Sequence, residues 1–171
     1  MKSQKTLITV LALLVVSVSI SLDAYAQDHP AILAGAELTR VVPTSFYFQG
    51  QSAPTQMRNS AATRFGTNRF VIVGMVDTSG YSAEIRARYQ GFFITDSSIS
   101  VGGETLSTGA YGFGFSNDGK LNILDVAGNQ VLSVATTNDK SLRRPRPLTM
   151  TMDGTNIRFY AGRDYVVVAL K

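Results

Sequence analysis

The segment 142–147 (LRRPRP) brings three arginines together beside two prolines. Each proline disfavours a helical conformation at the residue before it, so the segment is predicted to be an extended, exposed arm. Guanidinium groups bind phosphate and carboxylate oxygens, so Arg143, Arg144 and Arg146 form a candidate site for an anionic ligand such as a phosphate, a lipid headgroup or an acidic glycan. The alternative is a solvated loop whose charges pair with Asp139 or with acids of another strand, and the sequence favours this alternative.

A second candidate site is the glycine face of a strand predicted at 110–116 (AYGFGFS). Because side chains alternate between the two faces of a strand, one face carries small residues and the other carries aromatic ones. Glycine weakens a strand and marks places where another group approaches closely, so Gly112 and Gly114 are candidates for ligand contact. The sequence favours a packing role, in which the glycines relieve strain at the corner of a barrel while Tyr111, Phe113 and Phe115 fill a core.

The residue types that most often carry catalysis are scarce. His29 is the only histidine and there is no cysteine, which excludes thiol chemistry, disulfides and cysteine-based metal sites, and argues against a Ser-His-Asp arrangement. Two carboxylates can act as acid and base, but no spacing singles out a pair among Asp77, Glu84, Asp96, Glu104 and Asp125. A glycine-rich phosphate loop is also missing. We therefore assign no catalytic residue, no metal ligand and no cofactor.

The elements that would position these residues are predicted to be strands. The segment 69–76 (RFVIVGMV) is an apolar run typical of a buried strand. In 81–90 (YSAEIRARYQ), apolar and polar residues alternate over ten positions, which predicts a half-buried strand. The segments 40–42 and 45–48 are also rich in strand-forming residues, and the consecutive aromatics Phe46, Tyr47 and Phe48 must point to both faces.

One long segment in the first half of the chain is not predicted to be a strand. Residues 51–66 are mostly small or polar and include Pro54, so they are predicted to form a long loop. The only helical feature expected after the N-terminal region is a short turn near Arg58 to Thr63.

In the second half, short strands alternate with turns. Glycine-containing turns are predicted at Gly102-Gly103, at 117–120 (NDGK) and at 127–130 (AGNQ), and a second loop at 137–147. Tight turns join antiparallel neighbours, so the nine or ten predicted strands indicate an all-β fold. The expected architecture is an antiparallel meander that forms a small barrel or a sandwich.

The first 26 residues match the pattern of a cleavable secretory signal peptide. Lys2 and Lys5 precede an apolar stretch at 7–20, and Ala24-Tyr25-Ala26 supplies the small-x-small pattern of a cleavage site. The apolar stretch is shorter than the about 20 residues of a membrane-spanning helix, so we expect cleavage and not anchoring. Three parts are predicted, namely a signal peptide at 1–26, an N-terminal leader at 27–38 and a single β domain at 39–171.

Export and charge limit the partners. Residues 27–171 carry 14 basic and 11 acidic side chains, and a net charge of about +3 favours neither nucleic acid nor an anionic membrane. We expect no nucleic acid partner, and a membrane contact only through the signal peptide before cleavage. The partners that remain are an envelope protein, a glycan or another anionic ligand.

Five segments together resemble a group of uncharacterised secreted bacterial proteins with a small β domain. They are LTRVVPTSF (38–46), VDTSGY (76–81), GAYGF (109–113), RPRPL (144–148) and YAGRDYV (160–166). The resemblance implies export and a β fold. No activity is established for that group, so it implies no catalytic or binding residue.

The sequence therefore predicts an exported β domain, periplasmic or extracellular, that is a non-catalytic binding or structural protein of the cell envelope. Two alternatives stay open. One is a small hydrolase or isomerase that uses carboxylates at the mouth of a barrel, and the other is an assembly subunit that pairs through an exposed edge strand.

Overall fold

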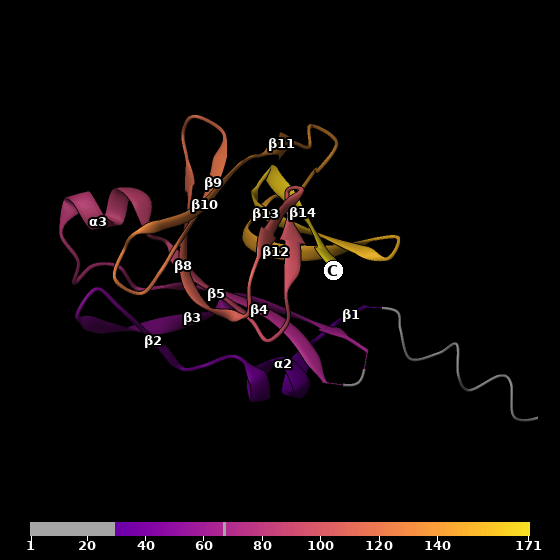
Figure 1. The fold of residues 1–171 in the computed structure, drawn as a ribbon, viewed down its shortest axis with the longest axis horizontal. Helices are drawn as coiled ribbons and strands as arrows, with labels where there is room; N and C mark the ends of the chain where they lie inside the picture. Colours follow the sequence, from indigo (N-terminus) through magenta and orange to yellow (C-terminus); the bar gives the residue numbers. More distant parts are fainter. Residues whose placement is uncertain (1–29, 67) are drawn as a thin grey trace, which may run out of the picture.

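The computed structural model describes residues 30–66 and 68–171, most of which form antiparallel β-strands (Figure 1). The first strands are β1 (Ala31–Ile32), β2 (Ser45–Phe48), β3 (Gln51–Phe65), β4 (Arg69–Val76) and β5 (Gly91–Thr95). They are followed by β6 (Ile99–Val101), β7 (Glu104–Leu106), β8 (Gly109–Ser116), β9 (Lys120–Leu124) and β10 (Gln130–Ala135). The last are β11 (Thr137–Asn138), β12 (Arg146–Asp153), β13 (Asn156–Gly162) and β14 (Asp164–Leu170). The predicted signal peptide and His29 lie outside the described residues.

Two antiparallel sheets make up the domain. The larger has the order β1-β3-β4-β5-β8-β9-β10, with β2 also paired to β3, and the smaller has the order β12-β13-β14-β6-β7, with β11 also paired to β14. The predicted all-β, antiparallel class is confirmed. The chain leaves the larger sheet after β5 to make the β6–β7 hairpin of the smaller one and returns as β8, so the expected simple meander is interrupted. In the part of the chain that the structure describes, the strands form no closed barrel.

The main core lies between the two sheets. Val73 of β4 and Phe113 of β8 reach it from the larger sheet, and Phe159 of β13 and Val168 of β14 reach it from the smaller one. The Phe159 ring packs edge-on against those of Phe113 and Phe93, with centroids 5.3 and 5.8 Å apart. Burying a side chain of this size stabilises the fold by about 1.5–3 kcal/mol, so these contacts hold the sheets face to face.

The other face of the larger sheet carries a second core. Phe46 and Phe48 of β2 lie there with Tyr81, Tyr89 and Phe92. Tyr89 and Phe48 are fully buried and stack with ring centroids 3.9 Å apart. The prediction that the aromatics at 46–48 point to both faces is confirmed, because the intervening Tyr47 is 58% exposed.

The strand predicted at 81–90 is wrong. This segment forms the helix α3 (Ala83–Arg88), and the Ser82 hydroxyl caps it by accepting a hydrogen bond from the Ile85 N–H at 3.3 Å. Tyr81, Ile85 and Tyr89 are spaced by four residues, which satisfies both a strand and a helix period. Only these three face the core, whereas the alanines between them are exposed.

The loop predicted at 51–66 is also wrong, together with its short helical turn. This segment is β3, the longest described strand, which pairs with β2, β4 and β1. Its register with β4 shifts between Thr55 and Ser60, where the Ser60 hydroxyl donates to the Met57 carbonyl at 2.6 Å. Small residues fit this strand because Ala61 and Ala62 are covered by packing on both faces of the sheet.

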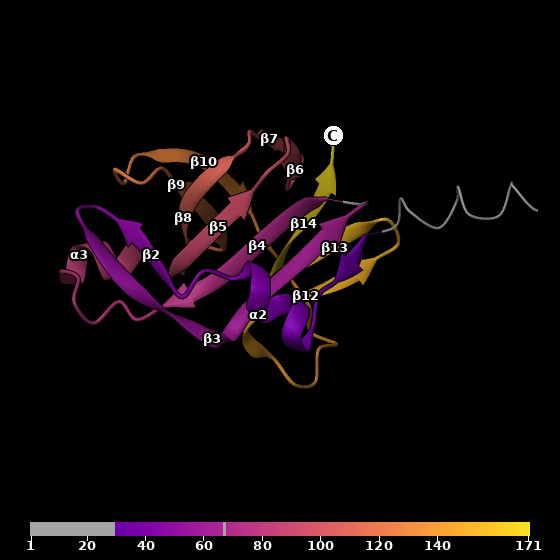
Figure 2. The ribbon, with the colours of Figure 1, turned by 90° about the horizontal axis from the view of Figure 1, so that it is seen from below.

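The region predicted to be a leader followed by a strand at 40–42 contains a second helix, α2 (Gly35–Val41). Before it, β1 pairs with Thr63 and Arg64 of β3. Figure 1 and Figure 2 show α2 beside β3 and away from α3. No described helix is long and apolar enough to cross a membrane.

The remaining turns follow the predictions. The turn at Gly102-Gly103 joins β6 to β7, the one at 117–120 joins β8 to β9, and the one at 127–130 leads from β9 into β10. The loop predicted at 137–147 is interrupted by β11 and ends where β12 begins at Arg146.

Candidate anion-binding surface

The segment between β11 and β12 is fastened to the edge of the smaller sheet through Asp139. Its carboxylate accepts hydrogen bonds from the Ser141 N–H at 2.9 Å and from the Tyr160 hydroxyl at 3.0 Å, and its N–H donates to the Arg163 carbonyl at 2.9 Å. The hydrogen bonds from Ser141 and Tyr160 hold the pKa of Asp139 below its usual value. A carboxylate whose charged form is favoured by these hydrogen bonds therefore anchors the start of the segment.

Strand pairing brings the basic residues of this region together. Arg146, the first residue of β12, lies opposite Gly162 of β13, so it is a neighbour of Arg163 in the β13–β14 turn. Arg163 in turn is bonded through its carbonyl to Asp139, next to Lys140. We call the exposed set Lys140, Arg143, Arg144, Arg146 and Arg163 the basic arm.

The charges of the basic arm are not neutralised within the described residues. The ion pairs found there join Lys120 to Asp118 and Arg158 to Asp153. The expected pairing of the arginines with Asp139 is therefore not formed, because that carboxylate is bonded to Ser141 and Tyr160. The other nearby acid, Asp164, accepts a hydrogen bond from the Asn138 amide at 2.7 Å.

The net positive charge of the domain is concentrated here. Residues 30–136 contain seven basic and seven acidic side chains, whereas residues 137–171 contain seven basic and three acidic ones. The modest total charge of the chain hides this segregation. A concentrated positive patch attracts anions more strongly than the same charge spread over the surface.

The outer face of the smaller sheet continues from the basic arm. Arg158 lies over the Tyr165 ring, 4.9 Å from its centroid, and is paired to Asp153 at 3.0 Å. The rings of Tyr165 and Tyr160 are 5.0 Å apart. Tyr165 is thus already in contact with a cation and with another ring of this chain, so its packing is explained without a ligand.

The glycine face of β8 is covered by the protein itself. A Cβ atom at Gly112 would lie 2.6 Å from Phe48 Cε2, and one at Gly114 would lie 2.2 Å from the Arg88 carbonyl oxygen at the end of α3. The close approach that these glycines allow is therefore made by Phe48 and α3. On the opposite face, Phe113 is buried in the main core with Tyr111 and Phe115 packed against it, as predicted.

The carboxylates considered for acid–base chemistry lie mostly in turns. Asp77 accepts from the Ser79 N–H, Asp96 from the Phe70 N–H, and Asp125 from the Ala127 and Asn129 N–H groups. These hydrogen bonds lower the pKa of Asp77 and Asp125, whereas a general acid needs a raised pKa. Glu84 lies in the first turn of α3 and Glu104 is exposed at the start of β7. Among residues 30–66 and 68–171, no three acids or histidines gather as a metal site would require.

Sequence reasoning missed two parts of the surface that the fold assembles. Lys140 lies just before the arginines in the chain and was overlooked, whereas Arg163 joins them only through the pairing of β13 with β12 and β14. Counting charge separately for the two parts of the chain would have indicated the patch. No family model, curated protein or solved structure matches this chain.

Proposed function

We propose that this chain is an exported domain that binds an anionic polymer of the cell envelope through the basic arm. The observation that carries the proposal is the set of five exposed basic side chains without an ion pair among the described residues. An arginine already paired with a carboxylate of the protein would have to break that ion pair to bind an anion, whereas an unpaired arginine binds the anion without breaking one.

A polymer fits the arm better than a single small anion. The segment is not extended throughout as predicted, because it turns at Lys140-Ser141 and bends at Arg143-Arg144 before β12 begins at Arg146. The charges of the basic arm are therefore spread over a turn, a bend, the start of β12 and the β13–β14 turn. A chain with repeating charges can meet several of them in succession. Each contact is weak and sensitive to salt, but several together give useful affinity.

An acidic polysaccharide is the polymer class that agrees with the predicted address outside the cytoplasm. A purely lipid partner is less favoured, because membrane-bound surfaces usually add apolar anchors to their charges. The large apolar residues that are most exposed are Tyr47, Val126, Val131 and Met152, and none of them belongs to the segment 137–147.

The proposal is tested on a heparin column and by binding titration at several salt concentrations, with the protein purified from cells that express the full chain. Replacing Arg143, Arg144 and Arg146 together by serine removes three charges from the arm. The matched control replaces Arg58, Arg69 and Arg86, which are exposed and scattered over the surface.

The arm variant is expected to elute at lower salt, with the slope of log K against log salt reduced by about 2 because three contacts are lost. The control variant should retain nearly the slope of the unmodified protein. Equal losses in both variants would show that only total charge matters and would contradict the proposal. Binding to anionic vesicles without binding to heparin would contradict the choice of a polymer.

A second candidate function, assembly through an edge strand, has one supporting observation. β10 ends the larger sheet, pairs only with β9 among the described strands, and carries no charge in its sequence QVLSVA. Val131 on this strand is 50% exposed. An uncharged edge strand invites pairing with another chain. Light scattering tests this, since replacing Val131 by lysine should dissociate any such assembly.

A further inference from the structure

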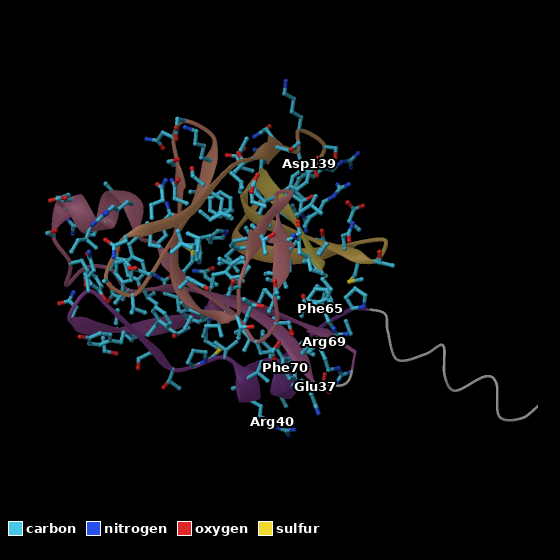
Figure 3. All side chains as sticks on the ribbon, in the orientation of Figure 1. Glu37, Arg40, Phe65, Arg69, Phe70 and Asp139 are labelled. Atoms are coloured by element: carbon cyan, nitrogen blue, oxygen red, sulfur yellow. The ribbon has the colours of Figure 1, made fainter. Side chains whose placement is uncertain are left out.

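A small cavity lies between α2 and the ends of β3 and β4, away from the basic arm. It has a volume of about 140 Å³ and is lined by Leu33, Glu37, Arg40, Val41, Arg64 and Phe70. In Figure 3, Glu37, Arg40 and Phe70 are labelled together near α2, whereas Asp139 of the arm's anchor lies at the other side of the molecule. The cavity is thus a separate feature.

One part of the lining is apolar. Leu33 is 5% exposed, and Val41 and Phe70 are half-buried. The cavity is fixed by the fold, because Phe70 lies opposite Arg64 in the β3–β4 pair and the Leu33 N–H donates to the Ala62 carbonyl of β3 at 2.8 Å. An apolar cavity of about 150 Å³ accommodates a benzene molecule, so this one has room for a small hydrocarbon group.

The rest of the lining is charged, with both signs present. Glu37 and Arg40 come from α2 and Arg64 from β3. No ion pair within the described residues joins Glu37 to any of these arginines. Opposite charges that share a cavity without neutralising one another are each available to a ligand.

These features together define a ligand with three groups: a carboxylate, an ammonium group and a small apolar body. We propose that the cavity binds a free α-amino acid with a branched apolar side chain. Arg40 and Arg64 hold the carboxylate, Glu37 holds the ammonium group, and the side chain lies against Leu33, Val41 and Phe70. Arginine suits a carboxylate because its planar donors match both oxygens. The proposal is independent of polymer binding by the arm.

The test is a titration of the full-length protein followed by ligand-observed NMR, with L-leucine as the probe. Its two comparison compounds are 4-methylpentanoate, which lacks the ammonium group, and 3-methylbutylamine, which lacks the carboxylate. L-leucine is expected to bind with a Kd of about 1 mM or below, as for a ligand of its size. Each comparison compound should bind about tenfold more weakly, because one charge-assisted hydrogen bond is lost.

Two variants assign the charged groups, and a third serves as control. Glu37→Gln should weaken L-leucine about tenfold and leave 4-methylpentanoate unchanged or tighter, because a carboxylate that repels it is removed. Arg64→Gln should weaken both compounds. Arg58→Gln, an exposed arginine on the same strand, should change neither. Glu37 is exposed on a short helix, so its variant is expected to fold even if Arg64→Gln does not.

Three results would overturn the assignment. The first is no binding of L-leucine at about 10 mM, a concentration tenfold above the expected Kd. The second is equal affinity for L-leucine and 4-methylpentanoate, which would leave Glu37 without a role. The third is the same loss in Arg58→Gln as in Arg64→Gln, which would place binding elsewhere.

Discussion

The glycine face of β8 makes a sharp test of how α3 is held on the sheet. In Gly114→Ala the new Cβ would lie 2.2 Å from the carbonyl oxygen of Arg88 and 2.8 Å from its carbonyl carbon. Ordinary contact begins near 3.4 Å, so β8 and the end of α3 must separate by about 1 Å. The obstacle is backbone, which cannot rotate away as a side chain can.

The size of the effect follows from this geometry. Overpacking a core by one methyl group costs about 1–3 kcal/mol, and we expect Gly114→Ala to reach the upper end of this range. Gly112→Ala should cost about 2 kcal/mol, because its Cβ would meet the Phe48 ring at 2.6 Å, and that ring is fixed by stacking on Tyr89. The matched control is Gly80→Ala, whose Cβ would meet only the end of the Gln51 side chain at 3.6 Å.

Urea unfolding followed by far-ultraviolet circular dichroism measures the three variants. Gly80→Ala should be unchanged or more stable by up to about 1 kcal/mol, since alanine restricts the unfolded chain. Gly114→Ala should lower the midpoint of thermal unfolding by about 6–12 °C for a domain of this size. If Gly114→Ala is as stable as Gly80→Ala, α3 does not pack on β8 as described, and the explanation of the glycine face is wrong.

Three further predictions test other parts of the chain. Tyr81→Phe should lower the free energy of unfolding by about 1 kcal/mol, because the Tyr81 hydroxyl donates to the backbone carbonyls of Phe48 and Gln51 at 3.1 Å. Tyr89→Phe should leave stability unchanged or raise it, because the Tyr89 hydroxyl is buried without a hydrogen-bond partner. Urea unfolding compares the two variants, and a larger loss in Tyr89→Phe than in Tyr81→Phe would contradict the prediction. The pKa of Asp125 is lowered in the folded state by hydrogen bonds from Asn129, so its contribution to stability is complete above the ordinary pKa of 3.8 and is lost as the pH falls through the folded-state value. The difference in unfolding free energy between the unmodified protein and Asp125→Asn should therefore shrink as the pH is lowered below about 4. A difference that does not change with pH would show that the charged Asp125 carboxylate does not stabilise the fold. Mass spectrometry of the protein recovered from outside the cytoplasm should find Gln27 as the first residue, and retention of residues 1–26 would contradict the predicted signal cleavage.

Much of the second half of the fold could be predicted from sequence, because its turns depend on local residues. Glycines at 102–103, 119 and 128 adopt positive φ values that other residues rarely take, so each turn is marked in the chain itself. The aromatic alternation of β8 likewise depends on one strand alone. Such local signals do not need the rest of the structure to be interpreted.

The first half could not be predicted because its elements depend on contacts made at a distance. β3 contains few strong strand formers, and its conformation is stabilised by pairing with three other strands. The segment at 81–90 satisfied two periods, and only the sheet beneath it distinguishes them. Ser82 followed by Glu84, with Arg86 and Arg88 later, was a helix-end signal that the alternation concealed.

The basic arm, too, depends partly on local sequence and partly on contacts made at a distance. The arginines at 143–146 could be identified from sequence, but their freedom from ion pairs depends on which partners the fold gives to the nearby acids. Asp139 is bonded to Ser141 and Tyr160, and Asp164 to Asn138. No spacing rule connects Asp139 with Tyr160, since they meet only through the pairing of β11, β13 and β14.

That choice of partners also bears on the proposed function. Like charges held close together repel, so an unpaired basic arm lowers stability unless something else fixes it in place. Here the anchoring acids are satisfied by hydroxyl, amide and backbone donors, which hold the segment without neutralising the arginines. If Asp139 were paired with an arginine, the contact that anchors the segment would also neutralise a positive charge that could bind an anion. Separating the groups that position the arm from those that face solvent keeps its positive charge available, which supports a binding role over a structural one.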